Sequence, residues 1–271
     1  MDLNLIKQKL TNLENKAQGK SQNKKNLFWK PSVGKQVVRI VPNKFNKSNP
    51  FTELKFYYGI GDINVMISPL NFGDKDPIAD FVKELYKTND RGNWDLAKQL
   101  RAKMRYFAPV VVRGEESEGV KLWQFGIGVF KDLLSIANDE EIGDYTDVYE
   151  GRDINVETVG PEVTGTRYNK SSVRVKIKQT PLSEDKAQVE TFLEEQVNPS
   201  EIFKRYPFDE IKAALQSHLN PEDTPQEGDI IDDDKPSKTN YALNTNSKKS
   251  KADEFDELFS GDDKKEDDLP F

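Results

Sequence analysis

The pattern of hydrophobic and polar positions is most regular between residues 172 and 179. Apolar residues alternate there with basic ones, namely Val173, Val175 and Ile177 with Arg174, Lys176 and Lys178. Because successive side chains of a β-strand point to opposite faces, this segment predicts a strand with one face in the core and one cationic face. Residues 163–178 hold five bases and no acid, whereas a passive surface usually mixes both signs. We therefore favour a binding role over a passive solvated surface.

A second stretch, Arg101–Phe130, combines predicted strands with bases and aromatic residues. Residues 110–112 predict a buried strand and residues 121–129 a second one, after an acidic turn at 114–119. Cations can follow a phosphate backbone and aromatic faces can stack on any base, so this mixture is typical of a sequence-tolerant single-strand site. The alternative is that the aromatic residues belong to the core and the cations to a solvated edge. The residues concerned are Arg101, Lys103, Arg105, Tyr106, Phe107, Arg113, Lys121, Trp123 and Phe125.

The remaining patterns predict further strands and helices. Residues 36–42 predict a strand with Val37, Arg39 and Val41 on one face and Val38 and Ile40 on the other. Arg39 is unexpected on such an apolar strand and indicates either a nucleic-acid contact or an ion pair at the strand edge. The other predicted elements are a strand at 51–58, helices at 78–85, 94–104 and 131–137, and helices from 187 to 215 with a start at 198–201. Residues 62–76 predict a loop and residues 139–149 an acidic solvated segment.

Both ends of the chain differ in composition from its middle, which predicts a basic N-terminal arm at 1–26, a folded core at 27–219 and a disordered acidic tail at 220–271. The arm carries an amphipathic helical pattern too short to be stable alone, followed by a basic linker. Its residues of interest are Leu3, Ile6, Leu10, Leu13, Lys20, Lys24 and Lys25. Apolar residues in an acidic tail are typical of a short motif that docks on partner proteins; here they are Phe255, Leu258, Phe259, Leu269, Pro270 and Phe271.

The net charge of −7 conceals a separation of charge along the chain. The first fifty residues carry eleven bases against two acids, whereas the tail carries sixteen acids against seven lysines. A basic front and an acidic tail indicate a protein that binds a polyanion and also carries a competing polyanion of its own.

Composition argues against several classes of function. With no cysteine the chain has no disulfide, no thiolate zinc site and no thiol nucleophile. His218 is the only histidine, and neither a nucleophile-elbow serine nor a Walker phosphate loop is present. The carboxylates lie in predicted helices, loops and the tail, away from the basic strands, which argues against a metal-dependent nuclease. We expect a non-enzymatic protein, and a cytoplasmic one because no signal peptide or run of about 20 apolar residues is present.

Several segments taken together resemble the single-stranded DNA-binding, helix-destabilising protein of T4-like bacteriophages. They are, in order, Trp29-Lys30, residues 34–42, Pro50-Phe51, residues 105–112, residues 119–125 and residues 175–179. The resemblance spans residues 27–219 and implies an α+β fold: an OB-like β-barrel with helical additions that binds single strands in a basic, aromatic-lined cleft. It also implies an arm for cooperative binding to a neighbouring molecule and an acidic tail that recruits replication proteins. Carried over by motif, Arg39, Arg105, Tyr106, Trp123 and Phe125 are expected in or near the cleft.

The chain departs from this family at the metal site. The family's best-known member holds a structural zinc with one His and three Cys, two of them in a Cys-Pro-x-Cys turn. Here the equivalent turn is Asp76-Pro77-Ile78-Ala79, so we expect no metal and no other cofactor. Packing of Ile78, Phe81, Val82 and Leu85 should hold this region instead. The family's basic-Ser/Thr arm motif is matched only loosely by Lys20-Ser21 and Lys24-Lys25. Separately, residues 267–271 resemble the tail tip of bacterial single-strand binding proteins, which docks repair and replication enzymes.

The sequence therefore predicts a cooperative, sequence-independent single-stranded DNA-binding protein of phage replication, recombination and repair, with self-association along DNA and tail-bound protein partners. An RNA-binding translational regulator using the same surface and a scaffold with a disordered tail are the alternatives. The predicted DNA-binding residues are Trp29, Lys30, Lys35, Arg39, Lys44, Arg101, Lys103, Arg105, Tyr106, Phe107, Arg113, Lys121, Trp123, Phe125, Arg167, Tyr168, Lys170, Arg174, Lys176 and Lys178.

Overall fold

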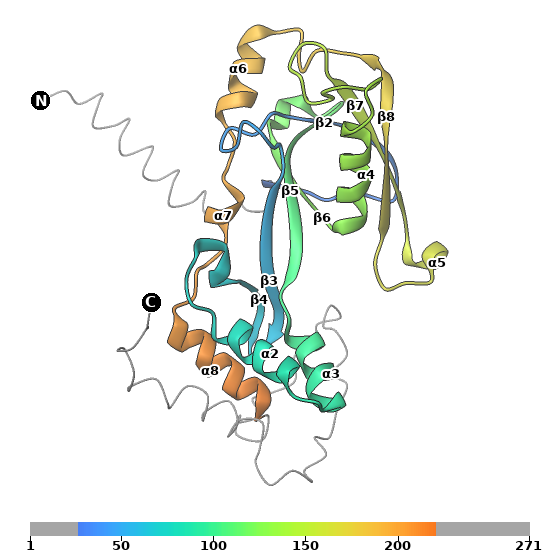
Figure 1. Ribbon diagram of the computed structural model, residues 1–271. Coiled ribbons are helices and arrows are strands. Elements are labelled where there is room, and N and C mark those ends of the chain that lie inside the picture. The colour runs from blue at the N-terminus through green and yellow to red at the C-terminus, as the bar shows by residue number, and fades with distance from the viewer. Residues whose placement is uncertain (1–26, 221–271) are drawn as a thin grey trace, which may run out of the picture. The chain divides into compact units, whose positions relative to one another are not determined.

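The computed structural model describes residues 27–220, which form a mixed α+β protein of eight strands and seven α-helices (Figure 1). The described residues divide into two compact units: residues 27–54 with 104–203, and residues 55–103 with 204–220. The chain thus passes from the first unit to the second and back before it enters the second again. The predictions for the arm at 1–26 and for the tail from residue 221 lie outside the described residues.

The first unit is built on a sheet whose strands follow one another in the order β1-β6-β5-β2-β7-β8. These strands are β1 (Phe28–Trp29), β2 (Gly34–Ile40), β5 (Lys103–Val112), β6 (Lys121–Phe125), β7 (Arg152–Val159) and β8 (Lys170–Gln179). Neighbouring strands are antiparallel except for β1, which runs parallel to β6. The predicted hairpin is confirmed, since β5 pairs with β6 from Tyr106↔Phe125 to Val110↔Lys121. Because β1 and β8 end the path, closure of the sheet into a barrel is not confirmed.

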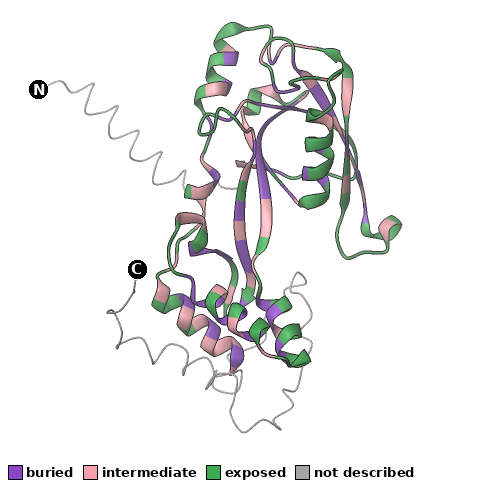
Figure 2. Cartoon of the chain, viewed as in Figure 1, coloured by how far each residue is buried: buried purple, intermediate pink, exposed green. Residues whose placement is uncertain are grey.

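The two faces of this sheet follow the alternation in the sequence. Val38 and Ile40 lie in the main core, with the inward residues of β5, β7 and the helix α4 (Ile127–Ala137). Val41 lies on the opposite face, in a smaller core with Val111 and with residues of α6 (Lys186–Glu194). The predicted division of this strand into two faces is therefore confirmed, and the face that carries Arg39 is covered as well. Figure 2 shows the resulting run of buried positions along β2 and β5.

The second unit packs helices against a β-hairpin. β3 (Thr52–Ile60) enters it from the first unit and pairs with β4 (Ile63–Ile67). The helices are α2 (Pro77–Lys87), α3 (Arg91–Leu100) and α8 (Phe208–Leu219), and their apolar faces share one core. As expected, Ile78, Phe81, Val82 and Leu85 are buried there. Gly61 in the hairpin turn has a φ of +56°, and a Cβ on it would lie 2.7 Å from the carbonyl oxygen of Ala214 on α8, so only glycine fits both the turn and the helix.

Shorter elements complete the chain: the 3-10 helices η1 (Pro69–Phe72) and η2 (Glu116–Glu118), α5 (Pro161–Thr164) and α7 (Pro199–Ile202). The predicted helix start at Asn198 is confirmed, because its side chain caps α7 by accepting a hydrogen bond from the Ser200 N–H at 3.2 Å. No helix of the described residues is long and apolar enough to cross a membrane.

Several predicted elements are corrected by the structure. The strand predicted over Lys121–Val129 stops at Phe125, because the chain turns into α4 at Gly126. The helix predicted over 94–104 ends at Leu100, and Met104 already belongs to β5. The predicted loop at 62–76 contains β4 and η1, and the predicted solvated segment at 139–149 buries Tyr145 and Thr146.

The alternating strand is corrected in one position. Val173 of β8 is buried and Val175 is half-buried against the core, but the Ile177 side chain is 87% exposed. β8 is the last strand of the sheet path, so it has a sheet neighbour on one side only, and Ile177 lies near its end.

Candidate nucleic-acid interface

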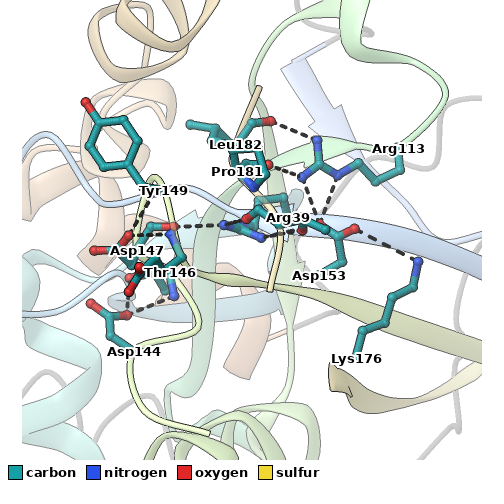
Figure 3. Close-up of polar contacts among 12 residues, drawn as sticks. Arg39, Arg113, Asp144, Thr146, Asp147, Tyr149, Asp153, Lys176, Pro181 and Leu182 are labelled. Atoms are coloured by element: carbon teal, nitrogen blue, oxygen red, sulfur yellow. Dashed lines mark hydrogen bonds and ion pairs between the residues drawn. The ribbon is translucent and has the colours of Figure 1, made fainter. Parts of the chain in front are cut away.

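A buried ionic cluster occupies the covered face of the first unit (Figure 3). Three cations converge on one carboxylate, Asp153 of β7: Arg39 of β2, Arg113 in the turn after β5, and Lys176 of β8. A nitrogen of the Arg39 guanidinium lies 3.5 Å from this carboxylate, one of Arg113 lies 2.9 Å from it, and the Lys176 ammonium lies 3.9 Å away. The sequence predicted that acidic residues lie away from the basic strands, and this is wrong for two of them. β7, a strand that was not predicted, pairs with the basic strands β2 and β8 and carries Asp153 and Glu157.

Arg39 is fully buried and supports two loops. Its Nη2 donates to the backbone carbonyl oxygens of Asp147 at 2.8 Å and Thr180 at 2.7 Å. Burial lowers the pKa of the Arg39 guanidinium from its ordinary value, and the Asp153 carboxylate opposes that shift. A Cβ on Gly151 would lie 2.5 Å from Arg39 Nη2, so only glycine leaves room for the guanidinium. Of the two hypotheses for Arg39, the structure favours the ion pair, in the interior instead of at a strand edge.

Three more of the predicted cations are already paired. Arg113 donates to the carbonyl oxygens of Leu182 and Pro181 in addition to Asp153. Lys121 is half-buried and forms ion pairs with Glu115 and Glu118 in the turn before it. Since desolvated, paired cations have few donors left for a phosphate, Arg113 and Lys121 are poorly placed to contact DNA directly. Lys176 retains more exposure but shares the Asp153 carboxylate.

The predicted aromatic residues of the hairpin lie in the protein core. Trp29, Tyr106, Phe107, Trp123 and Phe125 are all buried. Their rings pack on one another: Trp29 and Trp123 meet edge to face with centroids 5.3 Å apart, and Tyr106 stacks on Phe130 at 3.9 Å. With the Trp123 indole enclosed by protein, no base can stack on it without displacing part of the core. The alternative interpretation, that these are core aromatics, fits this geometry.

The hairpin formed by β7, α5 and β8 presents predicted residues that are exposed. Arg167, Lys170, Arg174 and Lys178 are exposed, and so is the Tyr168 ring, at 73%. Figure 1 shows α5 at the far end of this hairpin. Residues 163–178 contain no acid that could pair with these cations. An exposed aromatic ring among such cations suits a single strand, because the ring can stack on a base and the cations can pair with phosphates.

The other predicted cations are exposed at separate places. Lys30 and Lys35 lie at β1 and β2, where Lys35 is 3.8 Å from Glu157. Lys44 is exposed, and its ammonium donates to the carbonyl oxygen of Glu194 at 2.8 Å. In the second unit Arg101 is exposed, and the Lys103 ammonium lies 5.8 Å from the centre of the Tyr58 ring. Arg105 is half-buried in β5.

An exposed aromatic residue on α3 was not among the predicted site residues. The indole of Trp94 is 44% exposed, and its Nε1–H donates to the Thr88 carbonyl oxygen at 2.7 Å, which fixes the orientation of the ring. Arg91 and Lys98 lie three positions before it and four after it, so they share its face of the helix. This spacing is the signal that the sequence offers for a basic, aromatic helix face.

The turn at residues 76–79, where the resemblance implied a difference in metal binding, is held by a carboxylate. Asp76 caps α2 by accepting hydrogen bonds from the N–H groups of Ile78 at 3.0 Å and Ala79 at 3.2 Å. It also accepts from the hydroxyl groups of Tyr57 and Ser68. Within residues 27–220 no group of three or more His, Asp or Glu side chains is arranged to hold a metal ion. The prediction of metal independence remains to be tested by experiment.

Comparison with known proteins identifies the family. The model of the family described as gp32 DNA binding protein like matches residues 32–220. The chain belongs to this family. None of the curated proteins compared with the chain matches it. Membership of the gp32-like family confirms the resemblance to the T4-like phage protein and supports single-stranded DNA binding by this chain.

Proposed function

We propose that this gp32-like protein is a non-enzymatic, cooperative, sequence-independent single-stranded DNA-binding protein that protects and organises single strands in phage DNA replication, recombination and repair. The family match supports the DNA binding. We place the DNA-binding surface on the β7–β8 hairpin, because its cations and the ring of Tyr168 are exposed.

The geometry of β8 suits an extended phosphate backbone. Residues four positions apart on one face of a strand lie about 13 Å from each other, so Arg174 and Lys178 are two cations spaced along one face of the outermost strand. Lys170 continues the row toward the end of the hairpin. Cations that contact phosphates, and not the edges of bases, bind a strand whatever its sequence. This agrees with sequence-independent binding.

We also propose an OB-like interpretation of the first unit. The antiparallel path from β6 to β8, with α4 packed against the core, supports it. The arm at 1–26 would supply cooperativity, and the tail at 220–271 would recruit replication and repair proteins while competing with DNA for the cations. The site of action would be the cytoplasm of the infected bacterial host. Removing residues 220–271 should then raise affinity for single strands at low salt, with a gain that shrinks as salt screens both partners.

A salt-titrated binding isotherm with oligo-dT tests the proposed surface. The double variant Arg174→Gln, Lys178→Gln should flatten the slope of log affinity against log salt by about 0.7 for each phosphate that is no longer bound, and Tyr168→Ala should cost about 1 to 3 kcal/mol of affinity. Lys186→Gln on α6, an exposed lysine outside the hairpin, shows the effect of removing one surface charge elsewhere. If the hairpin variants bind like the control at every salt concentration, the surface is assigned wrongly.

The same assay separates the alternatives. Oligo-rU of equal length distinguishes a single-stranded DNA-binding protein from an RNA-binding translational regulator, because the regulator would bind oligo-rU more tightly than oligo-dT. Failure to bind either polymer would favour a scaffold whose basic strands are ordinary surface.

A further inference from the structure

A cation stacked on an aromatic ring in the second unit belongs to none of the surfaces described above. The guanidinium carbon of Arg205 lies 3.4 Å from the centre of the Phe72 ring. Arg205 is exposed, and Phe72 is half-buried at the end of η1. At this separation the planar guanidinium rests on the ring, so the ring covers one of its faces, and within residues 27–220 its N–H groups donate no hydrogen bond.

The platform beneath Arg205 is rigid. The Ser68 hydroxyl accepts a hydrogen bond from the Leu70 N–H at the start of η1, and Gly73, in the left-handed conformation, ends it. Asn71 fastens η1 to β3, because its side chain accepts from the Lys55 N–H at 2.8 Å and donates to the Lys55 carbonyl oxygen at 2.9 Å. The backbone on both sides of Phe72 is therefore fixed by hydrogen bonds, which places the ring beneath the guanidinium.

Arg205 is not neutralised by an acid in the described part of the chain. Among residues 27–220 no ion pair joins it to a carboxylate, in contrast to its neighbour Lys204, which lies 3.2 Å from Glu210. Lys204 also lies over an aromatic ring, that of Tyr206, at 4.2 Å. Lys204 and Arg205 thus lie over the rings of Tyr206 and Phe72. Of these two cations, only Arg205 lacks a carboxylate partner among residues 27–220.

We propose that Arg205, oriented by Phe72, binds a phosphate group of the nucleic-acid strand and gives the second unit a contact of its own. An oriented guanidinium with an open edge can donate two parallel hydrogen bonds to a phosphate, and less side-chain entropy is lost than for a free arginine. This site rests on the proposed function, since it takes the same polyanion, but it involves none of the residues predicted from the sequence. The competing role is structural, with Arg205 only fastening the segment 204–206 to η1.

Three variants measured with oligo-dT test the site: Arg205→Gln, Arg205→Lys and Phe72→Leu. Arg205→Gln should flatten the log affinity against log salt slope by about 0.7, the value for one phosphate contact on a single strand. Arg205→Lys should retain the slope and lower the affinity, because an ammonium keeps the charge without the planar fork. Phe72→Leu should also retain the slope with lower affinity, since the charge remains but is no longer oriented.

Lys83→Gln is the control for a general effect of net charge, because Lys83 is an exposed lysine on α2 of the same unit. Equal slope changes for Lys83→Gln and Arg205→Gln would overturn the site. So would an unchanged slope in Arg205→Gln together with a lowered melting temperature, which is the result expected of a purely structural stack. A further contradicting result is saturation of the site by inorganic phosphate at concentrations that do not affect oligo-dT binding. That result would show that the site binds a free anion and not the strand.

The outcome is separable from that of the proposed function. If the hairpin variants lose affinity while Arg205→Gln does not, only the Arg205 site fails. If the unaltered protein binds no single strand, the proposed function itself fails.

Discussion

The hydroxyl group of Tyr57 donates a hydrogen bond of 2.9 Å to the carboxylate of Asp76, on the turn that begins α2. Ser68 donates to the same oxygen at 2.5 Å, and all three residues are buried. Burial, followed by the charge of Asp76, raises the pKa of Tyr57 well above its ordinary value, so its hydroxyl remains a donor at every physiological pH. One carboxylate thus joins β3, the start of η1 and the start of α2.

Replacing Asp76 by Ala should destabilise the protein by about 3 kcal/mol or more. The substitution leaves two buried hydroxyl groups and two N–H groups of the first turn of α2 without their acceptor, and each of these four groups is costly to leave unpaired. Urea unfolding followed by circular dichroism measures the change. Asp74→Ala is the control, because Asp74 is exposed two residues away. Equal stability of the two variants would contradict a structural role for this carboxylate.

Chelation should leave the protein unaffected. With no cysteine in the chain and no metal-holding group of side chains among residues 27–220, EDTA is expected to change neither the melting temperature nor the affinity for oligo-dT. Elemental analysis of the purified protein completes the test. Stoichiometric zinc whose removal unfolds the protein is the contradicting result.

Arg39 and Arg174 should behave differently when their charges are removed. Arg39→Met leaves the Asp147 and Thr180 carbonyl groups without a donor and removes a partner of Asp153, so it should cost about 3 to 5 kcal/mol of stability. Because Arg39 is buried, the salt dependence of DNA binding by the folded variant should stay the same. Arg174→Gln on the exposed face should do the reverse, with unchanged stability and a flatter salt slope. A flatter salt slope in folded Arg39→Met would contradict this division.

Trp94 should report DNA binding by fluorescence. The chain has three tryptophans, and Trp29 and Trp123 are buried in the core whereas Trp94 is exposed beside cations. A base that stacks on the Trp94 indole would quench its emission. Trp94→Phe should therefore abolish most of the fluorescence change on addition of oligo-dT, with the fold retained as judged by circular dichroism. Undiminished quenching in Trp94→Phe would place the strand near another tryptophan.

His218 should make the stability depend on pH near neutrality. Burial lowers the pKa of this imidazole below its ordinary value of 6.5, and its Nδ1 accepts a hydrogen bond from the Gly61 N–H at 3.4 Å. The unfolded chain therefore binds a proton at a higher pH than the folded one. Stability should be complete above about pH 6.5 and fall as the pH decreases toward the lowered pKa. His218→Asn, which keeps an acceptor but does not titrate, should lack this loss of stability below about pH 6.5.

The sequence by itself determined the elements whose periodicity is local. The alternation along residues 36–42 defined the two faces of β2, and the alternation along 172–179 defined β8 and its cationic side. The β5–β6 hairpin, α2 and the helices after residue 186 also follow from apolar spacing. These predictions held because the period of a strand or helix is fixed by the backbone, whatever it packs against.

Only the tertiary structure decided which bases and aromatic residues face solvent. Alternation separates two faces but does not say what covers them, and the covering groups come from far along the chain. Asp147 and Thr180, which enclose Arg39, lie 108 and 141 residues beyond it. β7 was not predicted, although Ile154 and Val156 alternate there with polar residues, and its Asp153 pairs with three cations. The core encloses the rings of Trp123 and Phe125. Burial of a polar or aromatic side chain is a property of distant segments that meet, so it became visible only once the chain was folded.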